Sequence, residues 1–327
     1  MRMCATALVA TLLAVGYGCS DKPSAPASNA TGPAAAPVKV AFVTNNASDF
    51  WKIAQAGTEK AKKELGCEVI FRIPPTGTAQ EQQQIVQDLV TLGVSGIAIS
   101  PKNPENQTAM LDKAAESVKL ITQDSDAPNS KRICYIGTDN YQAGVAAGEL
   151  LKKALPNGGK IMLFVGTLDA QNAQDRKKGI EDALAGTSIE ILDTRTDETD
   201  RLKAKENAQN ALVVHPDIAC LVGLWSYNGP AILSGVQASG KLGQVKIVCF
   251  DEEDETLQGV KDGHIAGTIV QQPFEFGYQS VKLLVALAKN DRSLVPDNKQ
   301  IIVPVKTITQ ENVDGFWTQL KQQTGKS

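Results

Sequence analysis

Histidine, aromatic side chains and net charge are all scarce in this sequence. Its 327 residues include two histidines, and Phe, Trp and Tyr together make up 5%. The formal net charge of -3 gives no electrostatic reason to expect a nucleic acid as partner. A nucleophile elbow, an HExxH motif, a P-loop and a GxGxxG motif in the right context are all missing. His215 and His264 lie beside Pro216 and Gly263, so we expect them at the surface rather than in catalysis.

The sequence also lacks the paired cysteines of a metal site. Cys67, Cys134, Cys220 and Cys249 stand singly in or beside apolar runs, with no CxxC motif and no nearby histidine. We therefore predict no metal and no cofactor. A disulfide between Cys220 and Cys249 is possible in an exported protein, although buried free thiols are favoured.

The bulk composition is that of a packed, soluble protein. Hydrophobic residues make up 42% and charged residues 21%. A chain of 327 residues is long enough for two domains of ordinary size, but not for many.

The N-terminus reads as an export signal followed by a tether. Residues 1–19 carry one Arg and an apolar core, Ala7 to Val15, about half the roughly 20 residues of a spanning helix. Gly18-Cys19 resembles a bacterial lipoprotein processing site, which predicts cleavage before Cys19 and lipid attachment to it. Plain secretion is the alternative. Residues 20–37 are rich in Pro, Ala, Ser, Asn, Gly and Thr, as in a flexible linker.

The segment from Val38 to Leu65 sets the pattern for the rest of the chain. It begins with an apolar run typical of a buried parallel strand, continues through a polar loop, and becomes an amphipathic helix from Phe50. Ser48 or Asp49 is a candidate N-cap of this helix. Ligands of open parallel sheets bind at the carboxyl ends of the strands, so this loop is a candidate binding segment.

Strands and helices alternate along the remaining chain, and the pattern begins again near residue 139. We therefore predict an α/β fold of two lobes, each with a doubly wound parallel sheet. The predicted N-terminal lobe comprises residues 38–138 and 272–300, and the C-terminal lobe comprises 139–271 and 301–327. A last strand is expected at 301–305. Several crossings between the lobes imply a hinge made of more than one strand.

The chain resembles the ribose-type periplasmic sugar-binding proteins of ABC transporters, which have the type I substrate-binding fold. The resemblance covers nearly everything from residue 38 to the C-terminus. It depends on the segments VAFVTNNASDFW with GTEKAKKELG, LVTLGVSGIAISP, IGTDNYQAGVAAGELL, DRKKGIEDAL, VCFDEEDETLQGVKDGHIAGTIVQQP and VPVKTITQENVD. It implies two lobes that close around one sugar, with aromatic rings stacked on the ring of the sugar and charged and amide groups bound to its hydroxyls.

The resemblance also implies the contact residues. They are Asn45, Ser48, Phe50, Trp51, Asp124, Arg176, Asp251 and Gln271, and the loop after a predicted strand adds Trp225 as a pocket wall. Each has a second interpretation. Asp124 can cap a turn, Arg176 can belong to a basic surface, and the acidic run after Asp251 can be a solvated face or a helix start. The aromatic residues can simply cover a sheet edge.

Two positions depart from the ribose-binding pattern. Ser125 follows Asp124 where ribose binders have Arg, and residues 224–228 replace an Asn or Asp pair. The missing cation and the added indole change the charge and volume of the pocket. A pentose or hexose other than ribose, or a related polyol, therefore remains open as the ligand.

The predicted function is that of an extracytoplasmic, non-enzymatic sugar-binding protein. It passes its sugar to an ABC permease in the inner membrane, touches the membrane only through the lipid anchor, and is expected to be a monomer. One alternative is a sensory protein that feeds a chemoreceptor or a histidine kinase. Another is a carbohydrate-processing enzyme, since carboxylates are plentiful.

Overall fold

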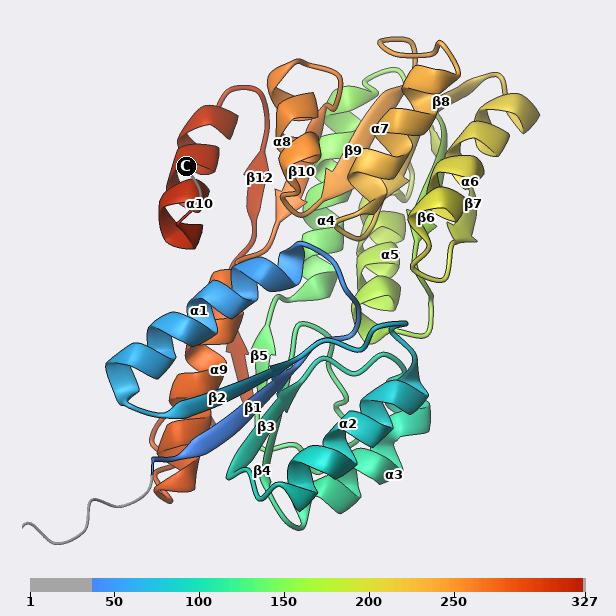
Figure 1. Cartoon of the computed structure of the whole chain (residues 1–327). Helices are drawn as coiled ribbons and strands as arrows, with labels where there is room; N and C mark the ends of the chain where they lie inside the picture. The colour runs from blue at the N-terminus through green and yellow to red at the C-terminus, as the bar shows by residue number, and fades with distance from the viewer. Residues whose placement is uncertain (1–36, 326–327) are drawn as a thin grey trace, which may run out of the picture. The chain divides into compact units, whose positions relative to one another are not determined.

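The computed structural model describes residues 37–325, so the predicted signal peptide, Cys19 and nearly all of the predicted linker lie outside the described residues. Within this range the chain forms two lobes (Figure 1). Each lobe has a six-stranded sheet with helices on both faces. The predicted α/β architecture of two sheet-based lobes is confirmed.

The first lobe contains the sheet that begins the described chain. In spatial order its strands are β11 (Gln300–Ile302), β5 (Tyr135–Gly137), β4 (Lys119–Gln123), β3 (Gly96–Ile99), β1 (Lys39–Val43) and β2 (Glu68–Arg72). All of these neighbours pair in parallel. The carboxyl ends of the strands therefore lie at one edge of the sheet, as ligand binding in open α/β sheets requires.

The second lobe repeats this order. Its strands are β12 (Lys306–Ile308), β10 (Gly267–Val270), β9 (Lys246–Phe250), β8 (Ile218–Gly223), β6 (Gly159–Val165) and β7 (Ile189–Thr196). Here β12 pairs antiparallel with β10, and the other pairs are parallel. The parallel pattern thus holds for five of the six strands in this sheet.

Helices cover both faces of the first sheet. They are α1 (Phe50–Leu65), α2 (Ala79–Thr91), α3 (Pro104–Ala115) and α9 (Pro273–Ala288). Val40 and Phe42 of β1 pack in the cluster of α1 and α9, whereas Ala41 and Val43 pack in the cluster of α2 and α3. This alternation follows from the two-residue period of a strand. It explains why β1 is apolar throughout.

The helices α1 and α9 lie side by side because both carry a glycine at the contact (Figure 1). A Cβ atom on Gly57 would lie 1.9 Å from the carbonyl oxygen of Phe274, and one on Gly277 would lie 2.0 Å from that of Ala54. No other residue type fits at this distance. The glycines thus hold α9, which follows the crossing from β10 in the other lobe, against α1.

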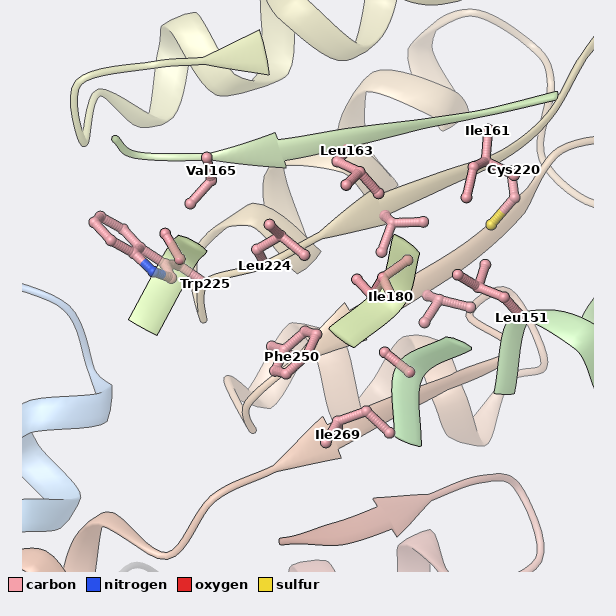
Figure 2. Packing of buried hydrophobic residues seen from close by; sticks show 14 of the residues in the cluster. Leu151, Ile161, Leu163, Val165, Ile180, Cys220, Leu224, Trp225, Phe250 and Ile269 are labelled. Atoms are coloured by element: carbon pink, nitrogen blue, oxygen red, sulfur yellow. The ribbon is translucent and has the colours of Figure 1, made fainter. Parts of the chain in front are cut away.

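The second lobe has a similar layered core. Its helices are α4 (Asn140–Ala154), α5 (Gln171–Leu184), α6 (Arg201–Val214), α7 (Asn228–Ala238), α8 (Asp254–Lys261) and α10 (Val313–Thr324). Figure 2 shows Ile161, Leu163 and Val165 of β6 facing Leu151 of α4 and Ile180 of α5. The residues between them on β6, Met162 and Phe164, pack with α6, α7 and α8 on the other face.

The chain crosses between the sheets where the last predicted strand was expected, and this corrects the prediction of one strand at 301–305. The segment contains β11 in the first sheet and is followed by β12 in the second. Pro304 lies between them and has no N–H to continue a ladder. Residues 301 and 302 therefore belong to the first lobe, not to the C-terminal lobe as predicted. Within residues 37–325, the other crossings lie between β5 and α4 and between β10 and α9.

The cysteines and helices of the described residues bear on two further predictions. Cys67, Cys134, Cys220 and Cys249 are buried free thiols, as the sequence favoured. Across residues 37–325, every helix is too short or too polar to cross a bilayer.

Candidate ligand-binding cavity

The nine predicted contact residues all line one cavity between the carboxyl ends of the two sheets. The cavity contains about 260 Å³ of space not filled by atoms, including the part open to solvent. Its walls are Asn45, Asn46, Ser48, Phe50, Trp51, Asp124, Asn172, Arg176, Trp225, Ser226, Asp251 and Gln271. The structure therefore brings together side chains that lie more than 200 positions apart in the sequence.

Asp124 is the carboxylate of the first lobe in this cavity. It follows β4 with a φ of 60°, a left-handed conformation that is uncommon for residues other than glycine. Its Oδ2 accepts hydrogen bonds from Ser100 Oγ at 2.7 Å, Asn45 Nδ2 at 3.3 Å and Asn172 Nδ2 at 3.4 Å. Asn172 belongs to the second lobe. This carboxylate is thus contacted from both lobes.

The pKa of Asp124 reflects its burial. Removal from water raises the pKa of the carboxyl group to about 6, although the charge of Arg176 and the Ser100 hydrogen bond act in the opposite direction. Arg176 and the Ser100 hydroxyl thus offset only part of the cost of burying the ionised carboxylate. Donors from a ligand would favour the charge further.

Arg176 is the cation in the cavity wall. It lies in the second turn of α5 and is 1% exposed. Its Nε donates to Asn140 Oδ1 at 2.9 Å and its Nη1 donates to the carbonyl oxygen of Leu224 at 2.6 Å. The guanidinium carbon lies 4.6 Å from the ring centre of Phe250, a cation–π contact. The predicted alternative of a basic surface is wrong for Arg176, because its side chain is buried.

The backbone around Arg176 depends on a close approach of α4 and α5. A Cβ atom on Gly144 would lie 2.2 Å from the carbonyl oxygen of Arg176. Only glycine permits this packing. The arginine is therefore held at the cavity by its hydrogen bonds and by the helix that carries it.

Asp251 and Gln271 complete the polar wall of the second lobe. Asp251 follows β9 with a φ of 66°. Its Oδ1 accepts from Gln271 Nε2 at 2.9 Å, and its Oδ2 lies 3.8 Å from Nη1 of Arg176. Burial raises the pKa of Asp251, and Arg176 opposes that shift. Gln271 lines the cavity, whereas its neighbour Gln272 donates to the carbonyl oxygen of Pro304.

The aromatic pair Phe50 and Trp51 is anchored in the core of the first lobe as well as lining the cavity. The two rings meet edge to face with centroids 4.9 Å apart, and Trp51 is 1% exposed. Its indole Nε1 donates to Asn46 Oδ1 at 3.2 Å. The same oxygen accepts from the backbone N–H of Ser48 at 2.9 Å. These bonds hold the loop that carries Asn45 and Ser48.

Trp225 forms the opposite wall. Figure 2 shows its indole beyond the strand ends, near Val165 and Leu224. Its backbone N–H donates to Asn228 Oδ1 at 3.0 Å, and a Cβ atom on Gly166 would lie 2.2 Å from the ring. The loop therefore fixes the ring tightly. The indole N–H, in contrast, is buried without a hydrogen-bond partner among residues 37–325.

Trp225 Nε1 is one of several buried polar atoms in the cavity walls that lack a partner within the described part of the chain. The others are Arg176 Nη2, Asn172 Oδ1 and Gln271 Oε1. Two of these four atoms are donors and two are acceptors. Buried polar groups are normally satisfied, so these atoms are available to a ligand that has both donors and acceptors. Hydroxyl groups meet that requirement.

Sequence reasoning missed three residues of the wall, Asn46, Asn172 and Ser226. Asn172 lies in the first turn of α5, which begins at Gln171. Its position after a strand was the available signal. The acidic run was also misread in part, since Glu252 and Glu253 are buried rather than solvated. The prediction that a helix can start in this run is confirmed, because α8 begins at Asp254.

The cavity walls consist of fixed hydrogen-bonding groups and aromatic rings. Among the described residues, no three or more His, Cys, Asp or Glu side chains are arranged to hold an ion.

Comparison with known proteins identifies the family. Residues 40–292 match the family model described as a periplasmic binding protein domain. The chain belongs to this family. The match covers most of both lobes and includes every predicted contact residue.

Several similar proteins are sugar-binding proteins. The ribose import binding protein RbsB of Salmonella typhimurium is 28% identical, over 74% of this chain and 82% of that protein. The solute-binding protein of an ABC transporter from Burkholderia graminis, solved in complex with D-arabinose, is 31% identical with a TM-score of 0.80, covering 84% of this chain and 96% of that one. GanP, a glucose-galactose binding protein from Geobacillus stearothermophilus, is 27% identical with a TM-score of 0.79, covering 84% and 98%.

These comparisons confirm the predicted resemblance to the periplasmic sugar-binding proteins of ABC transporters. The family is one of solute-binding proteins, which also confirms the prediction that the chain is not an enzyme. It is a periplasmic family, in agreement with the predicted extracytoplasmic location.

Proposed function

We propose that this protein binds one monosaccharide, or a related polyol, between its two lobes and delivers it to the permease of an ABC importer. The observation that carries the proposal is a cavity lined by both lobes, in which unpartnered donors and acceptors of the second lobe face the carboxyl end of the first sheet. The names of the relatives above, which bind ribose, arabinose, glucose or galactose, support the same class of ligand.

The two carboxylates and the guanidinium group supply the polar recognition. Asp124 and Asp251 accept hydrogen bonds from hydroxyl groups, and the free Nη2 of Arg176 donates to an oxygen. Phe50, Trp51 and Trp225 offer flat apolar surfaces for the C–H faces of a sugar ring. All nine predicted contact residues, with Asn172 and Ser226, act as ligand contacts in this proposal.

Closure of the lobes couples binding to a change of conformation. Asp124 of the first lobe already accepts a bond from Asn172 of the second, so a ligand in the cavity contacts both lobes only when they are together. A ligand shifts the population toward the state that it contacts more fully. The closed state then marks the loaded protein for the permease.

The departures from the ribose pattern favour another sugar. Ser125 directly follows Asp124 and has a buried hydroxyl without a partner among residues 37–325, and Asp126 is paired with Arg132 at 2.6 Å. Trp225 adds an indole to the wall. A pocket with this volume and these donors is suited to a pentose or hexose of different shape.

The location of the protein is proposed from residues outside the described range. Cys19 is the lipid attachment site, and residues 20–37 form the tether that holds the lobes near the membrane surface. The variant Cys19→Ser should move the protein from the membrane fraction to the soluble fraction of lysed cells. Equal amounts of wild type and variant in the membrane pellet would contradict the anchor.

A thermal-shift panel tests the sugar-binding function. The soluble part of the protein is heated with D-ribose, D-arabinose, D-xylose, D-glucose, D-galactose or a polyol, and with an amino acid as control. A ligand at about 100 times its Kd adds roughly 2.7 kcal/mol to stability, which corresponds to a rise of several degrees in Tm. A shift with the amino acid but none with any carbohydrate would contradict the proposal.

A further inference from the structure

Glu252 is an unusual residue beside the sugar cavity. It lies in the loop between β9 and α8, directly after Asp251, and is 4% exposed. Both of its carboxyl oxygens are buried without a hydrogen-bond partner in the described part of the chain. Buried carboxyl groups are normally paired, so this side chain calls for a physical explanation.

The neighbouring Glu253, in the same loop, is a buried acid that is paired with a cation. Both of its oxygens accept from Arg201, at 2.8 and 2.9 Å, in a bidentate ion pair. Arg201 favours the ionised form of Glu253 and opposes the rise in its pKa that burial causes. Glu252 has no equivalent cation within residues 37–325, although the two side chains are adjacent in sequence and equally buried.

Elements of both lobes cover Glu252. It lines two cavities with about 600 and 390 Å³ of space not filled by atoms, including the part open to solvent. Ile53 of α1 and Leu320 of α10 line both cavities with it. Phe274 of α9 lines the second. Because α1 and α9 belong to the first lobe, both lobes contribute to the surroundings of Glu252.

The charged groups around Glu252 do not neutralise it. Carboxyl groups facing the same space are those of Asp49, Asp251, Glu253, Asp254 and Glu275. Basic groups are those of Lys52, Lys306 and Lys321 in the cavity walls and Arg176 beyond Asp251. Burial raises the pKa of Glu252 well above its ordinary value, Asp251 and Glu253 raise it further, and Arg176 lowers it.

From this geometry we infer that Glu252 takes up a proton when the lobes close on the sugar. In an open state α1 and α9 no longer cover the side chain, so water solvates it and it ionises. In the closed state the carboxyl group is buried without a partner, and the neutral form is favoured because burial of an unpaired charge is costly. The inference rests on the proposed binding of a sugar between the lobes.

The linkage has a definite sign. The closed form has the higher pKa at Glu252 and holds more protons than the open form, so closure is favoured at low pH. Sugar affinity is highest near the ordinary glutamate pKa of about 4.3 and falls as the pH rises toward the raised value. The fall approaches tenfold per pH unit within that window. Binding of the sugar is thereby coupled to the acidity of the compartment.

Calorimetric titration tests the inference, with the sugar of the panel that raises Tm most as the probe. At about pH 6.5, roughly two units above the ordinary glutamate pKa, titrations are run in buffers with different ionisation enthalpies. The slope of observed enthalpy against buffer enthalpy gives the protons taken up per sugar. The variants are Glu252→Gln, which keeps the shape but cannot ionise, and Glu255→Gln, a matched change at an exposed position of the same acidic run.

Wild type and Glu255→Gln should take up more protons than Glu252→Gln, by up to about one per sugar. Asp124 and Asp251 are present in all three proteins, so the difference in proton uptake reports the change made at Glu252, including its influence on the neighbouring Asp251. The affinity of Glu252→Gln should also fall less steeply with pH and exceed that of wild type at high pH. Equal proton uptake in all three proteins, or an affinity that follows the sodium or potassium concentration instead of pH, would overturn the inference. If no sugar binds to any of them, it is the proposed function that fails.

Discussion

Each lobe carries an aspartate directly after a central strand of its sheet. Asp124 follows β4 and Asp251 follows β9, and each strand is third in spatial order from the β11 or β12 edge. Both have positive φ values, of 60° and 66°, and both are almost fully buried. Their hydrogen-bond partners differ. Asp124 accepts from a hydroxyl and two amides, whereas Asp251 accepts from one amide and lies 3.8 Å from a guanidinium nitrogen.

This comparison shows how the charge of Arg176 acts on both aspartates. Arg176 lowers the pKa of both Asp124 and Asp251, although it lies in the second lobe and approaches only Asp251 closely. The first-lobe aspartate also has three neutral donors, the Ser100 hydroxyl and the amides of Asn45 and Asn172. We therefore expect loss of Arg176 to affect the second lobe most. Loss of Asp124 should have consequences that differ from those of losing Asp251.

Removal of Arg176 should produce the largest effect. In Arg176→Met the carbonyl of Leu224 and the amide of Asn140 lose their donors, and two buried carboxyl groups lose the cation that they share. Breaking a buried ion pair costs about 3–5 kcal/mol, so we expect a clear drop in Tm and a loss of sugar affinity of at least about 100-fold. Calorimetry and thermal unfolding measure both quantities.

The matched control is Lys178→Met, on the same helix. Lys178 is exposed and pairs with Asp182 at the surface, where an ion pair contributes little. Its affinity should equal that of wild type. A Kd for Arg176→Met within threefold of the wild-type value would show that the arginine does not join the two aspartates in recognition.

Replacement of each aspartate by asparagine should separate the two lobes. Because the folded-state pKa of Asp124 is about 6, above its ordinary value of about 3.9, the folded state holds the extra proton. The ligand-free wild type therefore loses stability, by up to roughly 3 kcal/mol, as the pH rises between these two values. Asp124→Asn should not show this loss, and denaturant unfolding at several pH values measures it.

Asp251→Asn supplies the contrast. It also removes a carboxyl group with a raised pKa, but it leaves the guanidinium of Arg176 without its nearest carboxylate. At neutral pH, Asp251→Asn should be stabilised relative to wild type by less than Asp124→Asn is, or should be less stable than wild type. Both variants should weaken sugar binding about 10- to 100-fold, as loss of a charge-assisted hydrogen bond does. Identical pH profiles for the two variants would contradict the proposed difference.

Much of the site could be predicted because its residues follow apolar runs directly. Asp124, Trp225, Asp251 and Gln271 all come just after strands, and the carboxyl ends of parallel strands meet at one edge. Local pattern is therefore enough to bring them together. The family resemblance selected Asp124, Asp251 and Gln271 as contacts. It also selected Arg176, whose position on a helix next to Lys177 and Lys178 gave no sign of burial.

Other features depend on contacts that local pattern does not encode. Glu252 looks solvated in the sequence, and only the packing of α1, α9 and α10 against its loop buries it. The division of the last strand follows from Pro304, which ends one ladder while the chain moves to the other sheet. Asn172 bonds to a residue 48 positions earlier, across the cleft between the lobes.

The two tryptophans of the cavity allow the finest test of the comparison between lobes. Trp51 of the first lobe already donates its indole N–H to Asn46, whereas the indole N–H of Trp225 has no partner within residues 37–325. Trp225→Phe keeps an aromatic wall but removes the N–H donor and part of the buried ring, so affinity should fall about tenfold and Tm should fall through lost packing. Trp51→Phe loses a comparable part of its ring and also an internal hydrogen bond of its loop, so it should lower Tm more. A deoxy analogue that lacks the oxygen contacted by Trp225 should bind wild type and Trp225→Phe equally, whereas a preference for wild type with every analogue would place the indole N–H away from the ligand.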